Sequence, residues 1–477
     1  MSSTRRALAW SFAERYASLA INLASTLLLA RLLTPAQIGL YSLCAALAGM
    51  LAIVRDLGTS EYLIQAPDVA PERLRTVRGV ALLAGWSTAA LLWLLAGPAA
   101  GYFGAAGVAD VLRLLSLGFV LLPLTSPEFA RLNRELRFRE LFHLQLAGAL
   151  VQAGVALGLA SRGHGALSLA WGNLANVGVQ TLWLARPAWW GQGWPRCHGA
   201  LEVLRFGWRY SLARGIETAT QSVHEPLIAR QFGFASVGLF SRAYGLVDLF
   251  EQNVASAVVR VTTPVFAQAH RDGGALAERY ALATAMYTGV AWPFFVAVAL
   301  MAHDILLLMF GPQWVEAAPL ATVLALATLP HGLYALAPQL LSATGRVQAR
   351  LRMAWQVAPV HLGGLLLAAP FGLRAMACAW GITALWSSVL YARQLAVALR
   401  TSIGRLLGGC WRSAVLAALV GLSIWSASRL VDAWAPSALV ALSRLGLTGL
   451  AGLLAWLAIL RMLCHPLLAA FPFARKA

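Results

Sequence analysis

Long apolar stretches separated by short polar segments follow one another along the whole chain. A helix rises about 1.5 Å per residue, so about 20 consecutive apolar residues are needed to cross the hydrocarbon core of a bilayer. Each stretch is long enough to do so and is therefore predicted to be a membrane-spanning helix. The fourteen predicted spans cover roughly residues 8–30, 37–63, 77–97, 108–126, 141–160, 165–185, 206–230, 236–262, 280–301, 317–341, 353–372, 375–398, 411–430 and 438–462.

The composition excludes a soluble globular protein. Of the 477 residues, 59% are hydrophobic and only 12% are charged, whereas soluble domains carry about 25% charged residues. A water-soluble chain of this length needs a polar surface that this sequence cannot supply. We therefore expect an all-α, polytopic membrane protein with about fourteen transmembrane helices.

The basic residues predict the orientation of these helices. Lys and Arg together number 37 against 19 Asp and Glu, a net charge of +18, but they are scattered between the spans, so we expect no nucleic acid partner. If the N-terminus is cytoplasmic, 23 basic residues near the loops lie on the cytoplasmic side, and only Arg31, Arg162, Arg230, Arg374 and Arg429 lie on the other. Cytoplasmic loops are enriched in Lys and Arg, which predicts that both termini are cytoplasmic.

An internal repeat divides the chain. Residues 30–42 read ARLLTPAQIGLYS and residues 229–241 read ARQFGFASVGLFS, with six identities at a constant offset of 199. Six spans separate the copies, so both run in the same direction through the membrane, as in transporters with parallel repeats. We expect an N-terminal lobe over 1–200 (helices 1–6), a C-terminal lobe over 201–400 (helices 7–12), and helices 13–14 with a cytoplasmic tail over 401–477.

Ionisable and polar residues lie inside several of the predicted spans, where they are costly and mark functional sites. In spans 1 and 7, the first elements of the two repeats, these polar residues share one helical face. This pattern predicts a water-filled cavity lined by the two helices. It also predicts alternating access by rocking of the two helical bundles. Arg15 and Arg214 occupy equivalent repeat positions, and Arg55 lies at a similar depth in span 2. The residues predicted to line the substrate cavity are Arg15, Asn22, Arg55, Arg214, Glu217 and Gln221.

A guanidinium group binds phosphate oxygens in a bidentate manner and stays charged, so these arginines predict an anionic substrate. Four further residues are candidates for ion coupling: His224, Glu225, Asp248 and Glu251. An alternative is that the charges pair with one another and hold the bundle together. Arg15, Arg55 and Arg214 would then be neutralised by nearby acids, and Glu225 by Arg230 one turn further on.

The sequence carries no catalytic or cofactor signature. It contains no H-E-x-x-H or G-x-S-x-G motif, and its five cysteines are too far apart to form a metal-binding pair. We therefore expect no catalytic residues, no cofactor and no metal, and a protein that is not an enzyme.

Seven segments resemble a known family. They read, in chain order, RLLTPAQIGLYSLCAAL, RDLGTSEYLIQ, LNRELRFREL, GLFSRAYGL, TPVFAQ, MFGPQWVEAAPL and LLSATGRVQ. In this order they are similar to the O-antigen and exopolysaccharide flippases of the multidrug/oligosaccharidyl-lipid/polysaccharide exporter superfamily. The chain departs from the pattern at Val223-His224-Glu225, where such flippases often carry Asn-x-Asp.

The resemblance implies a bacterial inner-membrane transporter of fourteen helices in two lobes. It implies that the substrate is an undecaprenyl-diphosphate-linked oligosaccharide, moved from the inner to the outer leaflet for lipopolysaccharide or exopolysaccharide synthesis. The implied partners are membrane lipids, a polysaccharide polymerase and a chain-length regulator. Two alternatives stay open: a cation-coupled multidrug exporter of the same superfamily, and a polysaccharide polymerase or ligase, against which the absence of a large loop argues.

Overall fold

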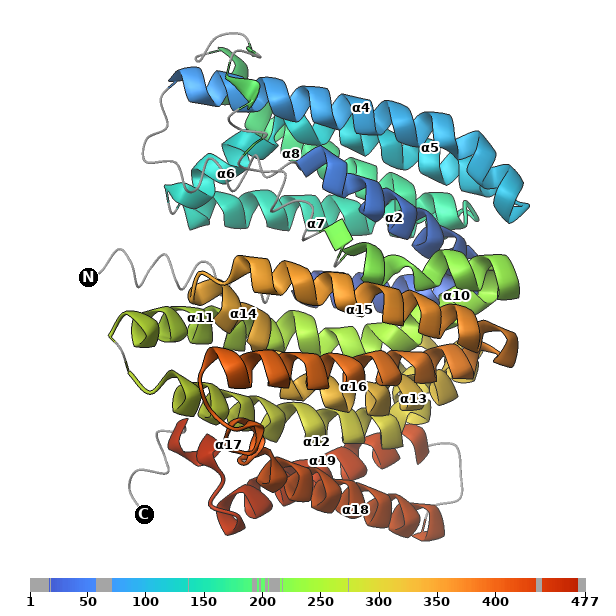
Figure 1. Ribbon diagram of the computed structural model, residues 1–477. Helices are drawn as coiled ribbons and strands as arrows, with labels where there is room; N and C mark the ends of the chain where they lie inside the picture. The colour runs from blue at the N-terminus through green and yellow to red at the C-terminus, as the bar shows by residue number, and fades with distance from the viewer. Residues whose placement is uncertain are drawn as a thin grey trace. The chain divides into compact units, whose positions relative to one another are not determined.

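The computed structural model describes most of the chain, and within that part all regular structure is helical (Figure 1). By contacts the chain divides into two compact units, Met1–Gly238 and Leu239–Ala477. The described residues are 17, 19–56, 71–135, 137–190, 195–196, 199–201, 205, 215–216, 218–272, 274–434 and 440–470.

The first unit is built from antiparallel helix pairs. α4 and α5 pack along their length, as do α7 and α8, while α2 packs against both α4 and α5 (Figure 1). Short turns join the partners, with Gly104 at φ +70° between α4 and α5 and Gly163 at φ +82° between α7 and α8, where glycine accepts positive φ without strain. The helices are α2 (Pro35–Asp56), α4 (Pro71–Phe103), α5 (Ala106–Leu121), η1 (Leu122–Leu124), α6 (Ser126–Arg134), α7 (Phe138–Ala160), α8 (Ala166–Trp190) and the first part of α10 (His224–Phe250).

The second unit is centred on the long helix α12, which packs against α11, α13, α18 and α19. α10 continues through a π-helical turn, η2, into α11, and the chain between α13 and α14 is interrupted by the 3-10 helix η4. The helices are η2 (Glu251–Ala255), α11 (Ser256–Arg271), α12 (Leu276–Phe310), η3 (Pro312–Ala317), α13 (Ala318–Thr328), η4 (Leu329–Leu333), α14 (Ala337–Ala343), α15 (Val347–Ala368), η5 (Ala369–Phe371), α16 (Leu373–Ala398), α17 (Ile403–Leu407), α18 (Cys410–Trp434), α19 (Val440–Met462) and η6 (Pro466–Ala470).

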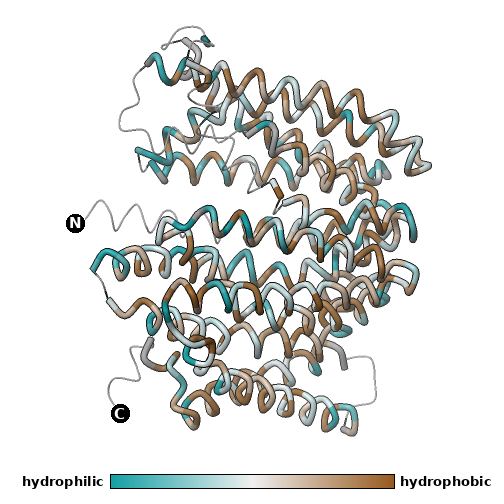
Figure 2. Tube along the Cα trace, in the orientation of Figure 1, coloured by the Kyte–Doolittle hydropathy of each residue, from teal (hydrophilic) through white to brown (hydrophobic). Residues whose placement is uncertain are grey.

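Hydrophobic residues recur along the helices of both units (Figure 2), and many large apolar side chains are exposed. Leu94, Leu182 and Leu367 are each more than 70% exposed, which suits a lipid environment rather than water. Among the described residues, ten helices are long and apolar enough to cross a membrane: Pro35–Ala52, Glu72–Phe103, Ala106–Leu124, Arg139–Ala160, Leu276–Phe310, Pro312–Ala343, Gln348–Phe371, Leu373–Ala398, Ile403–Ala433 and Leu442–Met462. The chain is therefore a multi-pass, all-helical membrane protein, and the total of fourteen spans stays a prediction.

Both copies of the sequence repeat contain a helix break at the same repeat position, by different means. In the first copy the preceding helix ends at Leu32, and α2 begins at Pro35 behind a capping box. In this box Thr34 Oγ1 accepts from the Gln37 N–H (3.3 Å) and Gln37 Oε1 accepts from the Thr34 N–H (3.0 Å). In the second copy Gly233, 199 residues after Thr34, breaks α10 with φ +80° and ψ 174°. These breaks coincide with the predicted junctions of spans 1–2 and 7–8.

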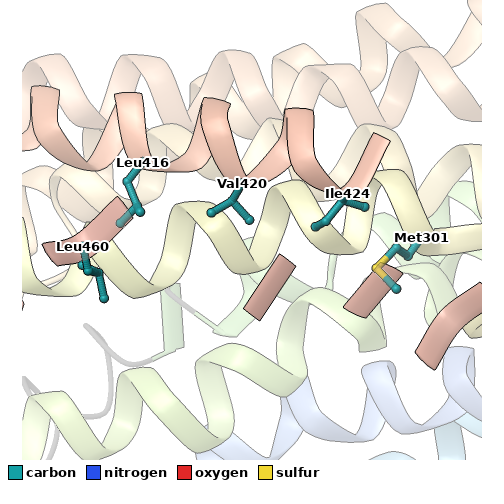
Figure 3. Close-up of a cluster of buried hydrophobic side chains, with 5 residues drawn as sticks. All are labelled: Met301, Leu416, Val420, Ile424 and Leu460. Atoms are coloured by element: carbon teal, nitrogen blue, oxygen red, sulfur yellow. The ribbon is translucent and has the colours of Figure 1, made fainter. Parts of the chain in front are cut away.

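A row of buried apolar side chains holds α18 and α19 against α12. Leu416, Val420 and Ile424 lie on successive turns of α18 and pack with Met301 of α12 and Leu460 of α19 (Figure 3). Each of the five is less than 9% exposed. Their spacing of four residues places them on one helical face, so this stripe fixes the two C-terminal helices to the second unit.

A buried polar network lies beside the first half of α12. The Leu467 N–H donates to His465 Nδ1 (3.2 Å), so the opposite ring nitrogen, Nε2, carries the proton and donates to Ser413 Oγ (3.0 Å). Thr288 Oγ1 lies 2.9 Å from the same hydroxyl. Burial and the nearby Arg412 guanidinium lower the pKa of His465, which keeps the imidazole neutral at neutral pH. The network joins α12, α18 and the C-terminal segment.

Candidate functional site

The structure describes seven of the ten sequence-predicted site residues. Arg15, Arg214 and Glu217 lie outside the described residues, so the cavity predicted between spans 1 and 7 stays a prediction. Asn22 and Gln221 are exposed on the helical segments that the structure describes there. Within the first unit, Arg55 and the pair His224–Glu225 contact different partners, and Asp248 and Glu251 belong to the second unit.

Arg55 occupies the last turn of α2 and is half-buried. Its guanidinium lies over the ring of Phe119 in α5, 5.3 Å from the centroid, a distance typical of a cation–π interaction. This contact holds the Arg55 side chain against α5.

His224 and Glu225 interact with each other at the start of α10. His224 is 2% exposed, and its Nε2 lies 3.3 Å from Glu225 Oε2. Arg230, the alternative partner expected from the sequence, instead lies over the ring of Tyr102, 5.0 Å from its centroid, and makes no ion pair with any described residue. The structure therefore pairs Glu225 with an imidazole rather than with a guanidinium.

A second polar centre surrounds Glu251. Its Oε1 accepts a hydrogen bond from the Tyr287 hydroxyl of α12 (3.1 Å) and lies 3.6 Å from His331 Nε2 of η4. Asp248, one turn earlier, accepts from Gln252 Nε2 at 2.5 Å. The Glu251 and His331 side chains are about one-third exposed, so an acid, an imidazole and a phenol meet at a place that water or an ion can enter.

This centre is built where two helices lose their regular form. Glu251 opens the π-helical turn η2, and His331 lies in the 3-10 segment η4 that separates α13 from α14. π-turns and interrupted membrane helices frequently occur at binding sites. In lipid each backbone group freed by such a break needs a partner, and neighbouring helices supply them.

Three side chains from α12 and α16 bind carbonyl groups of η4. Trp292 Nε1 donates to the Leu329 carbonyl (2.7 Å), Ser388 Oγ to the Pro330 carbonyl (2.8 Å), and the Tyr280 hydroxyl to the Leu333 carbonyl (3.4 Å). His331 then makes an edge contact with Tyr334, which stacks on Tyr391. The interrupted segment is therefore held rigidly, and His331 is oriented toward Glu251.

Arg242 is the deep arginine of the second unit, and aromatic rings hold it. Its guanidinium lies 5.6 Å from the ring centroids of both Phe310 and Trp314. Among the described residues no carboxylate pairs with it. The two rings explain how a single arginine is retained in an apolar part of the structure.

The two copies of the repeat touch at equivalent atoms. A Cβ added to Gly39 would lie 1.8 Å from the Phe234 carbonyl oxygen, and one added to Gly238 would lie 2.0 Å from the Pro35 carbonyl oxygen. Because 35 and 234, like 39 and 238, differ by 199, each contact is the repeat image of the other. Such reciprocity is the property of a two-fold contact.

The sequence singles out Glu251 and Asp248 as candidates, but it does not identify the partners of Glu251. Tyr287 lies in an apolar span with no charged neighbour, so its contact with Glu251 depends on how α12 packs. The sequence could have pointed to His331, because this residue shares a predicted helical face with Tyr334. No group of three or more His, Cys, Asp or Glu side chains that could hold a metal ion occurs in the described part of the chain.

The fold is found in solved transporter structures. The lipid II flippase MurJ in an inward closed conformation superposes with a TM-score of 0.75 at 12% identity, over 96% of this chain and 100% of its own. An inward-facing multidrug resistance transporter of the MATE family, in the MOP superfamily, gives 0.66 at 16% identity, over 80% and 95%. At these identities the likeness defines the fold, that of a MurJ- and MATE-like helical membrane protein.

The chain belongs to the family described as "Polysaccharide biosynthesis protein", whose sequence profile matches residues 28–319. It is 26% identical over 341 residues to the succinoglycan biosynthesis transport protein ExoT of Rhizobium meliloti, 22% over 318 to the teichuronic acid biosynthesis protein TuaB of Bacillus subtilis, and 21% over 322 to the lipopolysaccharide biosynthesis protein WzxC of Escherichia coli. These matches cover 66–67% of this chain and 65% of each relative, just under two thirds of the relatives' length.

Proposed function

We propose that the protein is a flippase that moves undecaprenyl-diphosphate-linked oligosaccharide repeat units across the bacterial inner membrane for surface polysaccharide synthesis. The family match, on a fold that resembles a lipid II flippase, carries the proposal. The names of the relatives, which concern succinoglycan, teichuronic acid and lipopolysaccharide, support a polysaccharide precursor as the cargo. A polysaccharide polymerase and a chain-length regulator are the proposed partners.

The proposed architecture has fourteen spans with both termini in the cytoplasm. It consists of two six-helix lobes, 1–200 and 201–400, followed by two helices and a cytoplasmic tail. The asymmetry of basic residues between the loops supports the orientation. The reciprocal contact of Gly39 and Gly238 supports a parallel repeat with its axis along the membrane normal, the geometry that rocking of two lobes requires.

Arg15, Arg55 and Arg214 are the proposed ligands of the diphosphate, with Asn22, Glu217 and Gln221 lining the same cavity. An anionic cargo favours arginines because guanidinium groups form paired hydrogen bonds with phosphate oxygens. The Phe119 ring holds the Arg55 side chain against α5.

Of the two candidate groups for ion coupling, the one around Glu251 has more contacts than the His224–Glu225 pair. Glu251 is joined by residues of two other elements, Tyr287 and His331, and Asp248 adds a second carboxylate. Glu225 has only its chain neighbour His224 among the described residues. We infer that Glu251 and His331 exchange a proton or a monovalent cation during the transport cycle.

Deletion of the gene in its native host tests the transport function. We expect loss of surface polysaccharide and accumulation of the lipid-linked repeat unit in the inner leaflet, where an impermeant oxidant added to intact spheroplasts does not modify its sugars. Loss of a polymerase or ligase would leave the same lipid exposed to the oxidant. Deletion of a multidrug exporter would change drug sensitivity and leave surface polysaccharide unchanged. Oxidant-accessible lipid or unchanged polysaccharide would therefore contradict the proposal.

Charge reversal tests the capture of the diphosphate. Arg15→Glu and Arg214→Glu are each expected to stop polysaccharide assembly at normal protein levels, whereas the lysine variants keep part of it because the charge survives. Arg162→Glu, an exposed arginine predicted on the opposite side of the membrane, is the matched control and should assemble polysaccharide normally. Normal assembly by both Arg15→Ala and Arg214→Ala would mean that these arginines are structural.

A further inference from the structure

A cavity of about 300 Å³ lies between α12, α18 and α19, outside every group of residues assigned to transport. Its rim is charged and polar and includes Asp304 of α12, Ser428, Arg429 and Asp432 of α18, and Arg444 of α19. The volume is at the lower end of the range for small-molecule sites, about 300–1,000 Å³.

The cavity lies at the depth of lipid headgroups. α12 has 35 residues and is therefore about 52 Å long, well beyond the hydrocarbon core of about 30 Å. About seven residues at each of its ends extend past that core, and Asp304 is one of the last seven. Asp432 is two residues from the end of α18, and Arg444 is four residues after the start of α19, so all three helices bring charged groups to the same level.

Arg444, one of the two arginines on the rim, joins α19 to α12 and α18. Arg444 Nε lies 3.2 Å from Asp304 Oδ2, and Arg444 Nη1 lies 3.2 Å from Asp432 Oδ1. The Asp304 side chain is 11% exposed, whereas that of Asp432 is 43% exposed. Asp432 therefore keeps one open side toward the cavity.

Arg429 and Asp432 are one turn apart on the same face of α18, yet they do not pair with each other. Residues three apart on a helix have Cβ atoms about 5–6 Å from each other and normally interact. Here the Arg429 guanidinium lies over the ring of Trp425, 5.4 Å from the centroid, and among the described residues it has no carboxylate partner. The rim thus presents the Arg429 guanidinium and, one turn away, the exposed side of the Asp432 carboxylate, which also pairs with Arg444.

The floor beneath the rim is apolar. Met301 and Ile424, which pack together in the buried row of Figure 3, also line the cavity. Leu422 of α18 and Leu447 and Leu454 of α19 are more than half exposed and lie deeper along the same two helices, at a level where acyl chains pack against protein. A molecule that fits has a zwitterionic head and an apolar tail.

We propose that this cavity binds an aminophospholipid, with its phosphate at Arg429 and its primary ammonium group at Asp432. A phosphate accepts hydrogen bonds from the guanidinium, and a primary ammonium donates them to a carboxylate, whereas a quaternary ammonium has no N–H to donate. The short spacer of an ethanolamine headgroup suits two residues one helical turn apart. The site concerns a bound lipid and does not depend on the proposed cargo.

Native mass spectrometry of the purified full-length protein tests this site. Phosphatidylethanolamine, phosphatidylglycerol and phosphatidylcholine with identical acyl chains are added separately, and the fraction of protein that retains one lipid is compared. We expect phosphatidylethanolamine to be retained most. Arg429→Gln should lower its apparent affinity about fivefold or more, the loss expected for a charge-assisted contact, while Arg429→Lys restores much of it.

Two further variants make the result specific. Arg374→Gln removes another exposed arginine and should leave retention unchanged. Asp432→Asn should remove the preference for phosphatidylethanolamine over phosphatidylcholine. Arg429 takes no part in the ion pairs of Arg444, so Arg429→Gln keeps the three helices joined. If Asp432→Asn fails to fold, lipid retention by Arg429→Gln alone tests the proposal. Equal retention of the three lipids, or unchanged phosphatidylethanolamine retention in Arg429→Gln, would overturn the proposal.

Discussion

Replacement of Gly39 or Gly238 by alanine is expected to reduce transport of the lipid-linked oligosaccharide at least tenfold. The added Cβ would lie 1.8 Å or 2.0 Å from a backbone carbonyl oxygen, a separation that no rotamer change relieves. Overpacking of this kind costs about 1–3 kcal/mol or more, so the helices must separate. The measurements are the oxidant-accessibility assay in the native host and the thermal stability of the purified protein.

The controls use the same two helices. A Cβ at Gly49 of α2 or Gly245 of α10 has no heavy atom within 4 Å, so Gly49→Ala and Gly245→Ala should transport normally. Since both contacts belong to one interface, the double variant Gly39→Ala/Gly238→Ala should be less impaired than the sum of the single effects. Wild-type transport and stability in both single variants would show that the helices need not approach so closely.

Glu251→Gln is expected to abolish the dependence of transport on an imposed proton or sodium gradient, whichever drives the wild-type protein. The amide has nearly the same shape and still accepts the hydrogen bond from the Tyr287 hydroxyl, but it carries no charge and binds no exchangeable proton. The His331 imidazole then loses its anionic partner, 3.6 Å away in the native protein. Initial transport rates in proteoliposomes, with and without the gradient, measure the effect.

Three companion variants separate charge from packing. Glu278→Gln removes an exposed carboxylate near the start of α12 and should keep the gradient dependence. Tyr287→Phe removes the hydrogen bond but not the charge, so it should slow transport and retain that dependence. Glu225→Gln tests the other candidate. If Glu251→Gln responds to the gradient like the wild type while Glu225→Gln does not, the coupling role belongs to the His224–Glu225 pair.

The positions of the helices could be predicted because a bilayer imposes a simple length rule on the sequence. The same holds for the breaks at Thr34 and Gly233, since a Thr-Pro-x-Gln capping box and a glycine are local signals that act within a few residues. The repeat offset of 199 pointed to equivalent positions, and the Gly39 and Gly238 contacts follow it.

The partners of the charged residues could not be predicted from local signals. In the alternative interpretation, acids close in the sequence were the expected ion-pair partners of Arg55, and Arg230 was the expected partner of Glu225. For Glu225 the structure instead gives the His224 imidazole, while Arg230 lies over the ring of Tyr102, because such pairs depend on which helices become neighbours. The π-turn at Glu251 and the 3-10 segment at His331 arise from tertiary support, as the carbonyl contacts from Trp292 and Ser388 indicate.

α18 and α19 are tied to α12 at two separate levels of that helix. In the first half of α12, Thr288 and Ser413 join His465, and the Trp456 indole donates to the Gly289 carbonyl. In its second half, Arg444 joins Asp304 and Asp432. A helix pair fixed at two distant points cannot pivot about either one. Any displacement of α12 during a conformational cycle therefore carries the C-terminal pair with it as one rigid body, and the lipid-facing surface of that body travels through the bilayer unchanged.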